Sequence, residues 1–514
     1  MPYADMQEFV ADLDARGWLA RVGVEVDPIL ETAAIAERQS KLPAADGLPP
    51  PVTDPVHGRC GGHALLFERV QGSAIPVAIN LFGSYARMRL ALGVDSFDEL
   101  AQRARELIKP QMPTTFIEKM KKLPELAKLA GFAPRSVRRG QCQEVVHTDD
   151  ANLLDLPVIQ CWPHDGEPGY GLKPAESRDG TGRYFTLAAV VTQPPGGGPV
   201  NLGMYRVQVF DRKLAAVHWH LHHDGARNFR AYRAQNERMP IALVLGGEPV
   251  LPFASTCPLP PDVSELLFAG FLQGSGIEMV PARTVPLEVP ARAEIVVEGW
   301  VDPQRTLLEG PFGDHTGFYS LADHYPALTV TAITHRAQPV YPATIVGRPP
   351  MEDYYLGKAT ERLFLPLLQM LIPDLIDYDL PMFGAFHNCV FVQIRKEYPL
   401  QARKVMNSIW GAGQMMFSKM IVVVDDYVNV HDEQDVLFHL AANVDWRRDI
   451  MVVDGPCDIL DHATPQYGSG AKIGIDATRK IPGEGTVRDW PAPLEISESI
   501  RARVQERWRE YGFE

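Results

Sequence analysis

Residues 201–224 read NLGMYRVQVFDRKLAAVHWHLHHD and form the densest polar stretch of the chain. Two adjoining strands explain the pattern, because alternate residues of a strand point to opposite faces. In the first strand, Asn201 and Tyr205 then share one face, and Arg206 lies on the other. In the second strand, one face carries His218, His220 and His222, and the opposite face carries Trp219, Leu221 and His223. Such a row of imidazoles beside an amide oxygen can bind a divalent cation if a carboxylate joins it. The alternative is a solvated strand edge with satisfied histidines.

The segments around this stretch predict a mostly β central region, which we interpret as a barrel. Alternating or β-branched residues recur over 185–193, 203–210, 241–245, 293–301 and 327–335. One helix, expected over 262–272, interrupts them. Further along, helices are expected over 359–371, 401–417 and 433–443, and strands over 389–395, 420–424 and 449–453. This βαβ rhythm predicts a parallel or mixed sheet that is covered by helices.

The N-terminal region has the pattern of a smaller α/β unit. Apolar residues at helical spacing precede Gly17, a strand is expected over 18–26, and a basic helical stretch runs from about residue 97 to 129. Residues 41–62 are rich in proline and glycine, which predicts a surface excursion. We therefore expect an N-terminal α/β domain (1–138), a central β domain (139–345), a C-terminal α/β domain (346–490) and a last charged helix within 491–514 that packs on another subunit.

Composition excludes several classes of protein. The chain has 514 residues, of which 46% are hydrophobic and 22% charged, as in an average globular enzyme of several domains. Its net charge of −14 disfavours nucleic acid as a partner. The six cysteines form no C-x-x-C pair, and no apolar run approaches the length of a membrane helix. The N-terminus lacks the pattern of a signal peptide, so a cytoplasmic protein is expected.

A second polar motif, EGPFGDHTG at 309–317, brings two carboxylates close together in sequence. Glycine and proline between Glu309 and Asp314 allow the chain to bend so that both side chains face one cavity. Burial or mutual repulsion would then raise the pKa of one carboxyl group and make it a proton donor. The alternative is a turn in which Asp314 caps the local backbone.

Weaker signals lie elsewhere in the sequence. Glu265 follows Ser264 at the expected start of a helix, where an acidic residue needs no function. Lys419 and Lys472, the latter in the expected loop GSGAKIG, could each approach a phosphate group. Asp425 and Asp426 at a strand end are interpreted as a solvated cap that could also bind a cation.

Taken together, several motifs resemble the UbiD family of non-oxidative aromatic acid decarboxylases, in order and in spacing. They are NLGMYR, HWHLHHDGA, PLPPDVSE, AEIVVEGWV, EGPFGDHTGFY, GRPPMED and GSGAKIGIDATRK. The resemblance extends from about residue 3 to residue 490. It implies an N-terminal α/β domain, a central split β-barrel of the flavin-reductase kind, a C-terminal α/β domain joined by a hinge near 347–350, and a dimerising C-terminal helix.

The resemblance also implies a cofactor and its ligands. The family uses prenylated FMN, held through its phosphate by a divalent metal, usually Mn²⁺, with K⁺ nearby. The metal ligands of the family match Asn201, His222 and Glu265, with His223 as the alternative histidine. The residues that match the cofactor-binding positions are Met204, Tyr205, Arg206, His218, Trp219, His220, His223 and Asp224.

The catalytic set of the family corresponds to Arg206, Glu309 and Asp314. These residues imply a reversible decarboxylase in which Asp314 returns a proton to the carbon that has lost CO₂. The favoured substrate is 4-hydroxy-3-polyprenylbenzoate; a naphthoate, a phenazine or a simple phenolic acid are alternatives. A flavin prenyltransferase would supply the cofactor, and the enzyme would be a homodimer or a dimer-based oligomer. An FMN-dependent reductase on the same barrel and a manganese hydrolase are the competing hypotheses.

Overall fold

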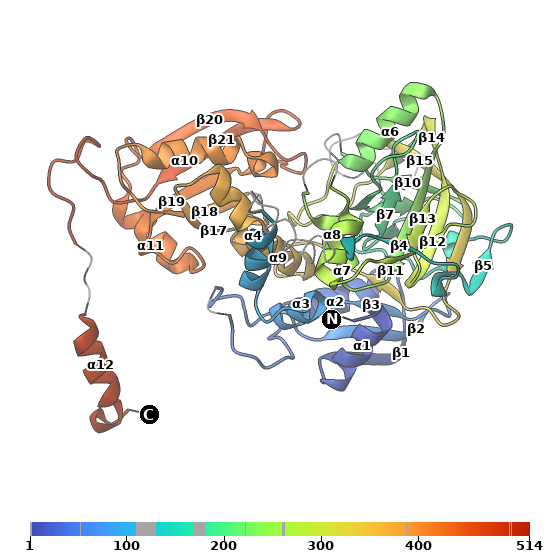
Figure 1. Ribbon diagram of the computed structural model, residues 1–514, viewed down its shortest axis with the longest axis horizontal. Helices are drawn as coiled ribbons and strands as arrows, with labels where there is room; N and C mark the ends of the chain where they lie inside the picture. The colour runs from blue at the N-terminus through green and yellow to red at the C-terminus, as the bar shows by residue number, and fades with distance from the viewer. Residues whose placement is uncertain are drawn as a thin grey trace, which may run out of the picture.

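The structure is a computed structural model that describes residues 3–51, 53–108, 130–167, 170, 180–220, 223–259, 263–386, 388–492, 494 and 496–513. Within these residues, the chain forms four sheets with the helices arranged around them (Figure 1). Of the basic helical stretch expected over residues 97–129, the structure describes residues 97–108, which form helix α4 (Phe97–Ile108). The rest of this stretch lies outside the described residues. His222 and Leu221 lie outside the described residues.

The N-terminal sheet has four strands and uses residues from two distant parts of the chain. Its order is β1 (Leu19–Val26), β2 (Ala64–Val70), β3 (Val77–Ile79) and β16 (Tyr341–Ala343). Helix α1 (Met6–Ala15) is capped by Asp5, whose side chain accepts a hydrogen bond from the Glu8 amide. Helices α2 (Glu31–Ser40) and α3 (Tyr85–Leu92) complete this region. Because β16 pairs with β3, the end of the central region is tied into the N-terminal sheet.

The central region contains a nine-stranded sheet. Its strands are β5 (Val145–His147), β6 (Tyr184–Phe185), β7 (Ala189–Thr192), β8 (Asn201–Met204), β9 (Val207–Val209), β10 (Leu214–Val217), β11 (Met239–Gly246), β14 (Ala293–Glu309) and β15 (Asp323–His335). The path across the sheet runs β6-β9-β10-β15-β14-β11-β7-β8, and β5 pairs with β15. A smaller sheet joins β4 (Arg135–Ser136), β12 (Glu278–Pro281) and β13 (Glu288–Pro290).

The strand order shows that this large sheet is curled. Strand β8 lies at one end of the path and β9 lies next to the other end, yet only Tyr205 and Arg206 separate them in the chain. Six strand spacings of about 4.8 Å would put them roughly 29 Å apart in a flat sheet. Three residue steps, from Met204 to Val207, span at most about 11 Å. The sheet must therefore bend until its two ends approach each other at Arg206. The β-rich central region is as expected, whereas its assignment as a flavin-reductase-like split barrel stays a prediction.

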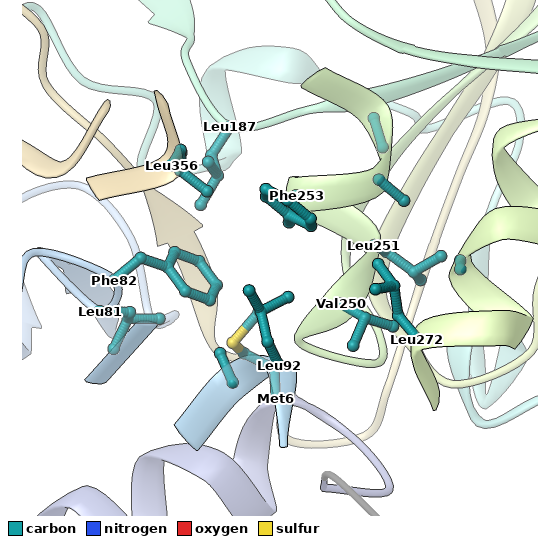
Figure 2. Packing of buried hydrophobic residues seen from close by; sticks show 14 of the residues in the cluster. Met6, Leu81, Phe82, Leu92, Leu187, Val250, Leu251, Phe253, Leu272 and Leu356 are labelled. Atoms are coloured by element: carbon teal, nitrogen blue, oxygen red, sulfur yellow. The ribbon is translucent and has the colours of Figure 1, made fainter. Parts of the chain in front are cut away.

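Apolar packing joins the N-terminal region to three helices. These are α7 (Val250–Thr256) and α8 (Glu265–Gln273) of the central region, and α9 (Glu352–Leu371). Figure 2 shows Met6, Phe82 and Leu92 facing Phe253 of α7, with Leu356 of α9 on the same cluster. These side chains are almost completely buried. The third central helix, α6 (Asp224–Gln235), packs against β8 and β14 instead.

The C-terminal region is a five-stranded mixed sheet. Its order is β17 (Leu375–Asp379), β18 (Cys389–Ile394), β19 (Met420–Asp425), β21 (Ser469–Asp476) and β20 (Ile450–Pro456). The three middle strands are parallel and the two edge strands antiparallel, so the expected mixed sheet is confirmed. Helix α11 (Glu433–Asn443) has the predicted bounds, but α10 (Gln401–Trp410) ends at Trp410 rather than at residue 417. Residues 413–417 form a separate 3₁₀ turn.

The C-terminal helix α12 (Glu498–Glu506) stands apart from the rest of the molecule (Figure 1). None of its residues is buried, and a short 3₁₀ turn over Trp508–Tyr511 follows it. Among the described residues, no helix is both long enough and apolar enough to cross a membrane.

Candidate active site

The centre of the candidate site is Arg206, which lies where the two ends of the curled sheet approach each other. Its Nε donates to Oε1 of Glu309 at 2.9 Å, and its Nη1 donates to Oδ2 of Asp314 at 2.6 Å. Nη2 donates to the hydroxyl of Ser320 at 2.9 Å, and the guanidinium lies 4.7 Å from the ring centroid of Phe312. The side chain of Arg206 is only 9% exposed and that of Glu309 is fully buried. One guanidinium therefore binds both carboxylates of the EGPFGDHTG motif at once.

The EGPFGDHTG segment is a turn between β14 and β15. Glu309 is the last residue of β14, and the amide of Gly317 donates to the carbonyl oxygen of Asp314 at 2.9 Å. The Asp314 carboxylate also accepts the His315 amide at 2.8 Å and the His315 ring Nδ1 at 2.9 Å. Asp314 thus caps the local backbone and also contacts Arg206, so both interpretations of the motif describe part of its geometry.

The histidines extend this polar cluster. His218 lies directly after β10, and its Nδ1 is 2.8 Å from Oε2 of Glu309. The rings of His218 and His220 are in hydrogen-bond contact through their Nε2 atoms. The ring of His223 stacks on that of His220, with centroids 4.9 Å apart. The strand predicted for these residues is wrong at His218, Trp219 and His220, because β10 ends at Val217. The His223 amide donates to the His220 carbonyl.

Arg206, His218 and His315 together lower the pKa values of the two carboxyl groups. Burial would raise the pKa of Glu309, but Arg206 and His218 lower it to about 2. Burial also opposes ionisation of Asp314, but the hydrogen bond from His315 and the charges of His315 and Arg206 hold its pKa below the ordinary value. The expectation that one of these carboxyl groups has a raised pKa is therefore wrong. His315 has a raised pKa, because its contact with Asp314 outweighs the effect of burial, so the imidazole beside Asp314 takes up a proton more readily than a free imidazole does.

Asn201 and Glu265 come together at β8. Asn201 is the first residue of β8 and donates its side-chain amide to the Thr192 hydroxyl at 3.1 Å. Glu265 is the first residue of α8, after the N-cap Ser264, and its Oε2 accepts the amide of Leu202 at 2.9 Å. Burial raises the pKa of Glu265 to about 7. A divalent cation would reverse that effect, so an amide oxygen and a buried carboxylate on adjacent elements are a donor set that fits a metal.

The residues expected around a flavin lie near this pair. The hydroxyl of Tyr205 accepts the Gly225 amide at 3.3 Å, and the rings of Tyr205 and Trp219 pack edge to face with centroids 6.2 Å apart. The indole nitrogen of Trp219 is buried and has no hydrogen-bond partner among the residues that the structure describes. Asp224 begins α6, and within the described part of the chain no side chain caps the N-terminus of this helix. A buried donor without a partner and an uncapped helix N-terminus fit a ligand that carries a phosphate group. Met204 is partly buried on the same strand as Asn201.

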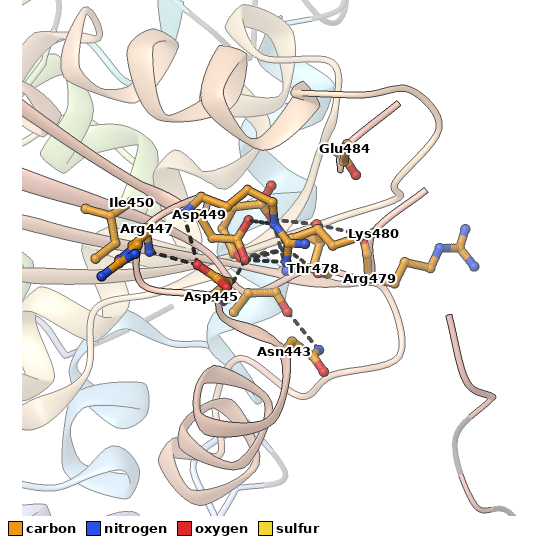
Figure 3. Close-up of polar contacts among 12 residues, drawn as sticks. Asn443, Asp445, Arg447, Asp449, Ile450, Thr478, Arg479, Lys480 and Glu484 are labelled. Carbon is orange, nitrogen blue, oxygen red and sulfur yellow. Dashed lines mark hydrogen bonds and ion pairs between the residues drawn. The ribbon is translucent and has the colours of Figure 1, made fainter. Parts of the chain in front are cut away.

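Other polar residues singled out from the sequence lie elsewhere and have structural partners. Lys472 lies on β21, not in a loop, and donates to the carbonyl of Met416. Lys419 pairs with Asp461 at 2.8 Å. Asp425 is buried rather than solvated, and its Oδ2 accepts the Arg479 amide at 2.5 Å. The closing segment that contains Lys480 supports the end of the C-terminal sheet, with Lys480 lying beside Asp449 and Thr478 (Figure 3).

One more cluster has the composition of a metal site. Glu361, Asp379 and His431 are buried and have ligand atoms within 4.8 Å of one another. The ammonium group of Lys358 donates to both Glu361, at 3.0 Å, and Asp379. The chain itself therefore supplies the cation that these carboxylates need, and we interpret the cluster as an ionic core between α9 and β17.

Some residues at the site were given no role from the sequence. Ser320 and Phe312 contact Arg206, and His315 contacts Asp314. Asp165 accepts the Gly313 amide at 2.8 Å. Of these residues, only His315 could have been identified from the sequence, since it is an ionisable residue inside the EGPFGDHTG motif.

Comparisons with known proteins identify the family. Models of the 3-octaprenyl-4-hydroxybenzoate carboxy-lyase N-terminal domain, Rift-related domain and C-terminal domain match residues 10–107, 135–349 and 354–477. An uncharacterized protein of Aquifex aeolicus is 45% identical over 513 residues, which cover 100% of this chain and 99% of that protein.

Solved structures agree in fold. The vanillic acid decarboxylase of Sedimentibacter hydroxybenzoicus in closed form is 26% identical over 99% of both chains, with a TM-score of 0.80. The open form of the same enzyme has a TM-score of 0.75, with the same identity and coverage. The UbiD-class enzyme HmfF of Pelotomaculum thermopropionicum in complex with FMN is also 26% identical, over 98% of this chain and 99% of that one, with a TM-score of 0.74. An evolved dimeric form of HmfF is in complex with prFMN, with 26% identity, 97% and 100% coverage and a TM-score of 0.71. The three matching models together span most of the sequence, and the chain therefore belongs to the UbiD family of carboxy-lyases.

Proposed function

We propose that this protein is a non-oxidative, reversible decarboxylase of an aromatic carboxylic acid that uses prenylated FMN. The observation that carries the proposal is the buried contact of Arg206 with both Glu309 and Asp314. The solved relatives, which include a vanillic acid decarboxylase and HmfF with FMN or prFMN, support the substrate class and the cofactor.

The acid and base work is assigned to the residues around Arg206. Arg206 keeps Glu309 ionised and, together with His315, keeps Asp314 ionised. It also fixes the orientation of both carboxylates, since charge-assisted contacts of this kind are short and directional. Asp314 is the proton donor to the ring carbon. Its low pKa means that the proton reaches it from a neighbour, and the raised pKa and 2.9 Å contact of His315 make this imidazole the source. In the carboxylating direction, Asp314 takes the ring proton and passes it to His315.

The cofactor is assigned to the neighbouring set of residues. Prenylated FMN supplies an electrophilic centre that accepts the electrons of the broken carbon–carbon bond. Asn201, His222 and Glu265 would hold Mn²⁺ at its phosphate, with K⁺ nearby. The residues proposed to line the cofactor are Met204, Tyr205, Arg206, His218, Trp219, His220, His223 and Asp224. Burial around Arg206 keeps water from the reacting carbon.

The preferred substrate is 4-hydroxy-3-polyprenylbenzoate, with a naphthoate, a phenazine or a simple phenolic acid as alternatives. Aspartate rather than glutamate at position 314 supports a hydroxyaryl acid, by resemblance to that branch of the family. We further propose a homodimer through α12, whose region exposes the apolar side chains of Ile500, Trp508 and Phe513. A flavin prenyltransferase would supply the cofactor.

The first experiment is to co-express the chain with a flavin prenyltransferase and to identify what it binds. Denaturing mass spectrometry should find prenylated FMN, and elemental analysis should find manganese. The loaded protein should then release CO₂ from one or more acids of a panel that spans the four substrate classes. Ordinary FMN with nicotinamide-dependent turnover would instead establish a reductase, and metal without flavin a hydrolase.

A further inference from the structure

Trp162 lies between the loop that carries Asp314 and the segment that leads into helix α9. Its indole Nε1 donates to the carbonyl oxygen of Val346 at 2.9 Å. A Cβ on Gly313 would lie 2.1 Å from Cδ1 of the indole, and a Cβ on Gly347 would lie 2.7 Å from its Cζ2. Neither glycine can therefore carry a side chain while the indole keeps its place. The ring is in close contact with both segments at once.

Asp165 fastens this tryptophan segment to the Asp314 loop. Its fully buried carboxylate accepts the amides of Cys161 at 3.2 Å and Trp162 at 2.8 Å through Oδ2. Through Oδ1 it accepts the amide of Gly313 at 2.8 Å. Gly313 directly precedes Asp314, so the backbone position of Asp314 depends on this carboxylate. A second link, from the Gly166 amide to the carbonyl of Pro311 at 2.8 Å, holds the other side of the loop.

The opposite side of the indole contacts the connection to the C-terminal region. Val346 and Gly347 follow β16 and precede helix α9, which starts at Glu352 and leads into the C-terminal sheet. The whole chain superposes better on the closed form of the vanillic acid decarboxylase than on its open form. A rotation of α9 relative to the central sheet would displace Val346 and Gly347, and the indole would lose its hydrogen-bond acceptor.

We propose that Trp162 is a positioning residue that links the connection at Val346–Gly347 to the Asp314 loop, so that domain closure sets the contact between Asp314 and Arg206. The inference rests on the proposed function, because it gives Asp314 a role in the reaction. Packed contacts of this kind transmit small displacements, since protein interiors are dense and resist compression. A shift of about 1 Å at a reacting group can lower a rate by roughly 100-fold.

The test is the substitution Trp162→Phe, which keeps an aromatic ring and removes the N–H donor. We expect the kcat of the loaded enzyme to fall about tenfold with little change in KM, since a small misplacement of Asp314 affects the chemical step. The flavin content should stay that of the wild type. Gly347→Ala, which forces the indole to move, should lower kcat further.

Trp410→Phe is the matched control. The indole nitrogen of Trp410 also donates to a backbone carbonyl, that of Ser418, at 2.8 Å, but within the C-terminal region. This variant should keep the wild-type kcat.

Hydrogen–deuterium exchange of the peptide that contains Gly313 gives a readout that needs no turnover. Its amide exchange should be faster in Trp162→Phe than in the wild type or in Trp410→Phe. Unchanged exchange at Gly313 together with an unchanged kcat would overturn the inference. If the wild-type protein binds prenylated FMN but decarboxylates nothing, the proposed function fails, whereas faster exchange at Gly313 would still support the link through Trp162.

Discussion

Asp314 is the residue at which the proposed chemistry can be tested most directly. In Asp314→Asn, the side-chain oxygen can still accept the hydrogen bond from Arg206, but the amide cannot deliver a proton to carbon. We expect decarboxylation to fall by about 10²- to 10⁴-fold, the usual contribution of a positioned acid or base. Steady-state rates of the loaded enzyme measure the loss, and the flavin spectrum shows whether the cofactor is retained.

Ser320→Ala is the control for that substitution. Ser320 also contacts Arg206, at 2.9 Å, but its hydroxyl has no assigned proton to transfer. Its removal should change the rate far less than Asp314→Asn does. Equal losses in the two variants would mean that the geometry around Arg206, rather than a proton on Asp314, is what the reaction requires.

The sequence identifies which residue types meet at this site better than it predicts their charge states. EGPFGDHTG and NLGMYR contain the three residues that form the buried contact. Arg206 is 103 residues from Glu309 in the chain and 108 from Asp314, so its effect on their pKa values depends on the fold. The contact between the rings of His223 and His220 also depends on the fold, because it requires the strand to end at Val217.

At the scale of secondary-structure elements, the proposed metal site depends on how α8 starts beside β8. Glu265→Gln keeps an oxygen that can accept the Leu202 amide but removes the charge that a divalent cation needs. Manganese and flavin retention should fall by at least the 10- to 100-fold that loss of an outer metal partner typically causes. Elemental analysis and flavin absorbance of the purified variant measure the effect.

Glu248→Gln is a matched control for the metal site. Glu248 is also buried, lies just before the start of a helix, α7, and also has a pKa raised to about 7 by burial. It lines a separate cavity of about 340 Å³ with Ala4, Gln273 and Arg292. This variant should keep wild-type metal and flavin content, and loss of both in Glu248→Gln would show that any buried glutamate change disturbs binding.

The elements that periodicity predicted well are those whose ends coincide with strong local signals. Helix α11 starts after Asp432, whose side chain caps two amides, and it was predicted with its true bounds. Helix α9 begins at Glu352, seven positions before the prediction, because acidic residues in its first turn interrupt the apolar pattern while favouring the helix N-terminus. The glycines around Lys472 predict a loop, whereas pairing with β19 and β20 makes that segment a strand.

At the scale of the whole molecule, helix α9 is the element on which the regions meet. Tyr354 donates its hydroxyl to Asp54 of the 41–62 excursion at 2.7 Å, and Lys358 binds Asp379 of the C-terminal sheet. The excursion was expected on the surface, but Asp54 is buried. Sequence patterns could not reveal this arrangement, because its partners are up to 300 residues apart. The stability of the folded molecule should therefore depend on the charges around α9.

His431 makes that dependence measurable as a function of pH. Burial alone would lower its pKa, but hydrogen bonds to Asp377 at 3.0 Å and Asp379 at 2.7 Å raise it from 6.5 to about 9. Because the folded pKa exceeds the unfolded one, the stabilisation is complete below pH 6.5 and is lost as pH rises through about 9. The shift corresponds to roughly 3 kcal/mol of unfolding free energy. Urea unfolding between pH 6 and pH 9.5 should show this decrease for the wild type and a flatter profile for His431→Gln.

His439→Gln, which removes the looser 3.6 Å pair with Asp435 on α11, should keep the wild-type slope. A wild-type slope in His431→Gln as well would assign the pH dependence to other groups.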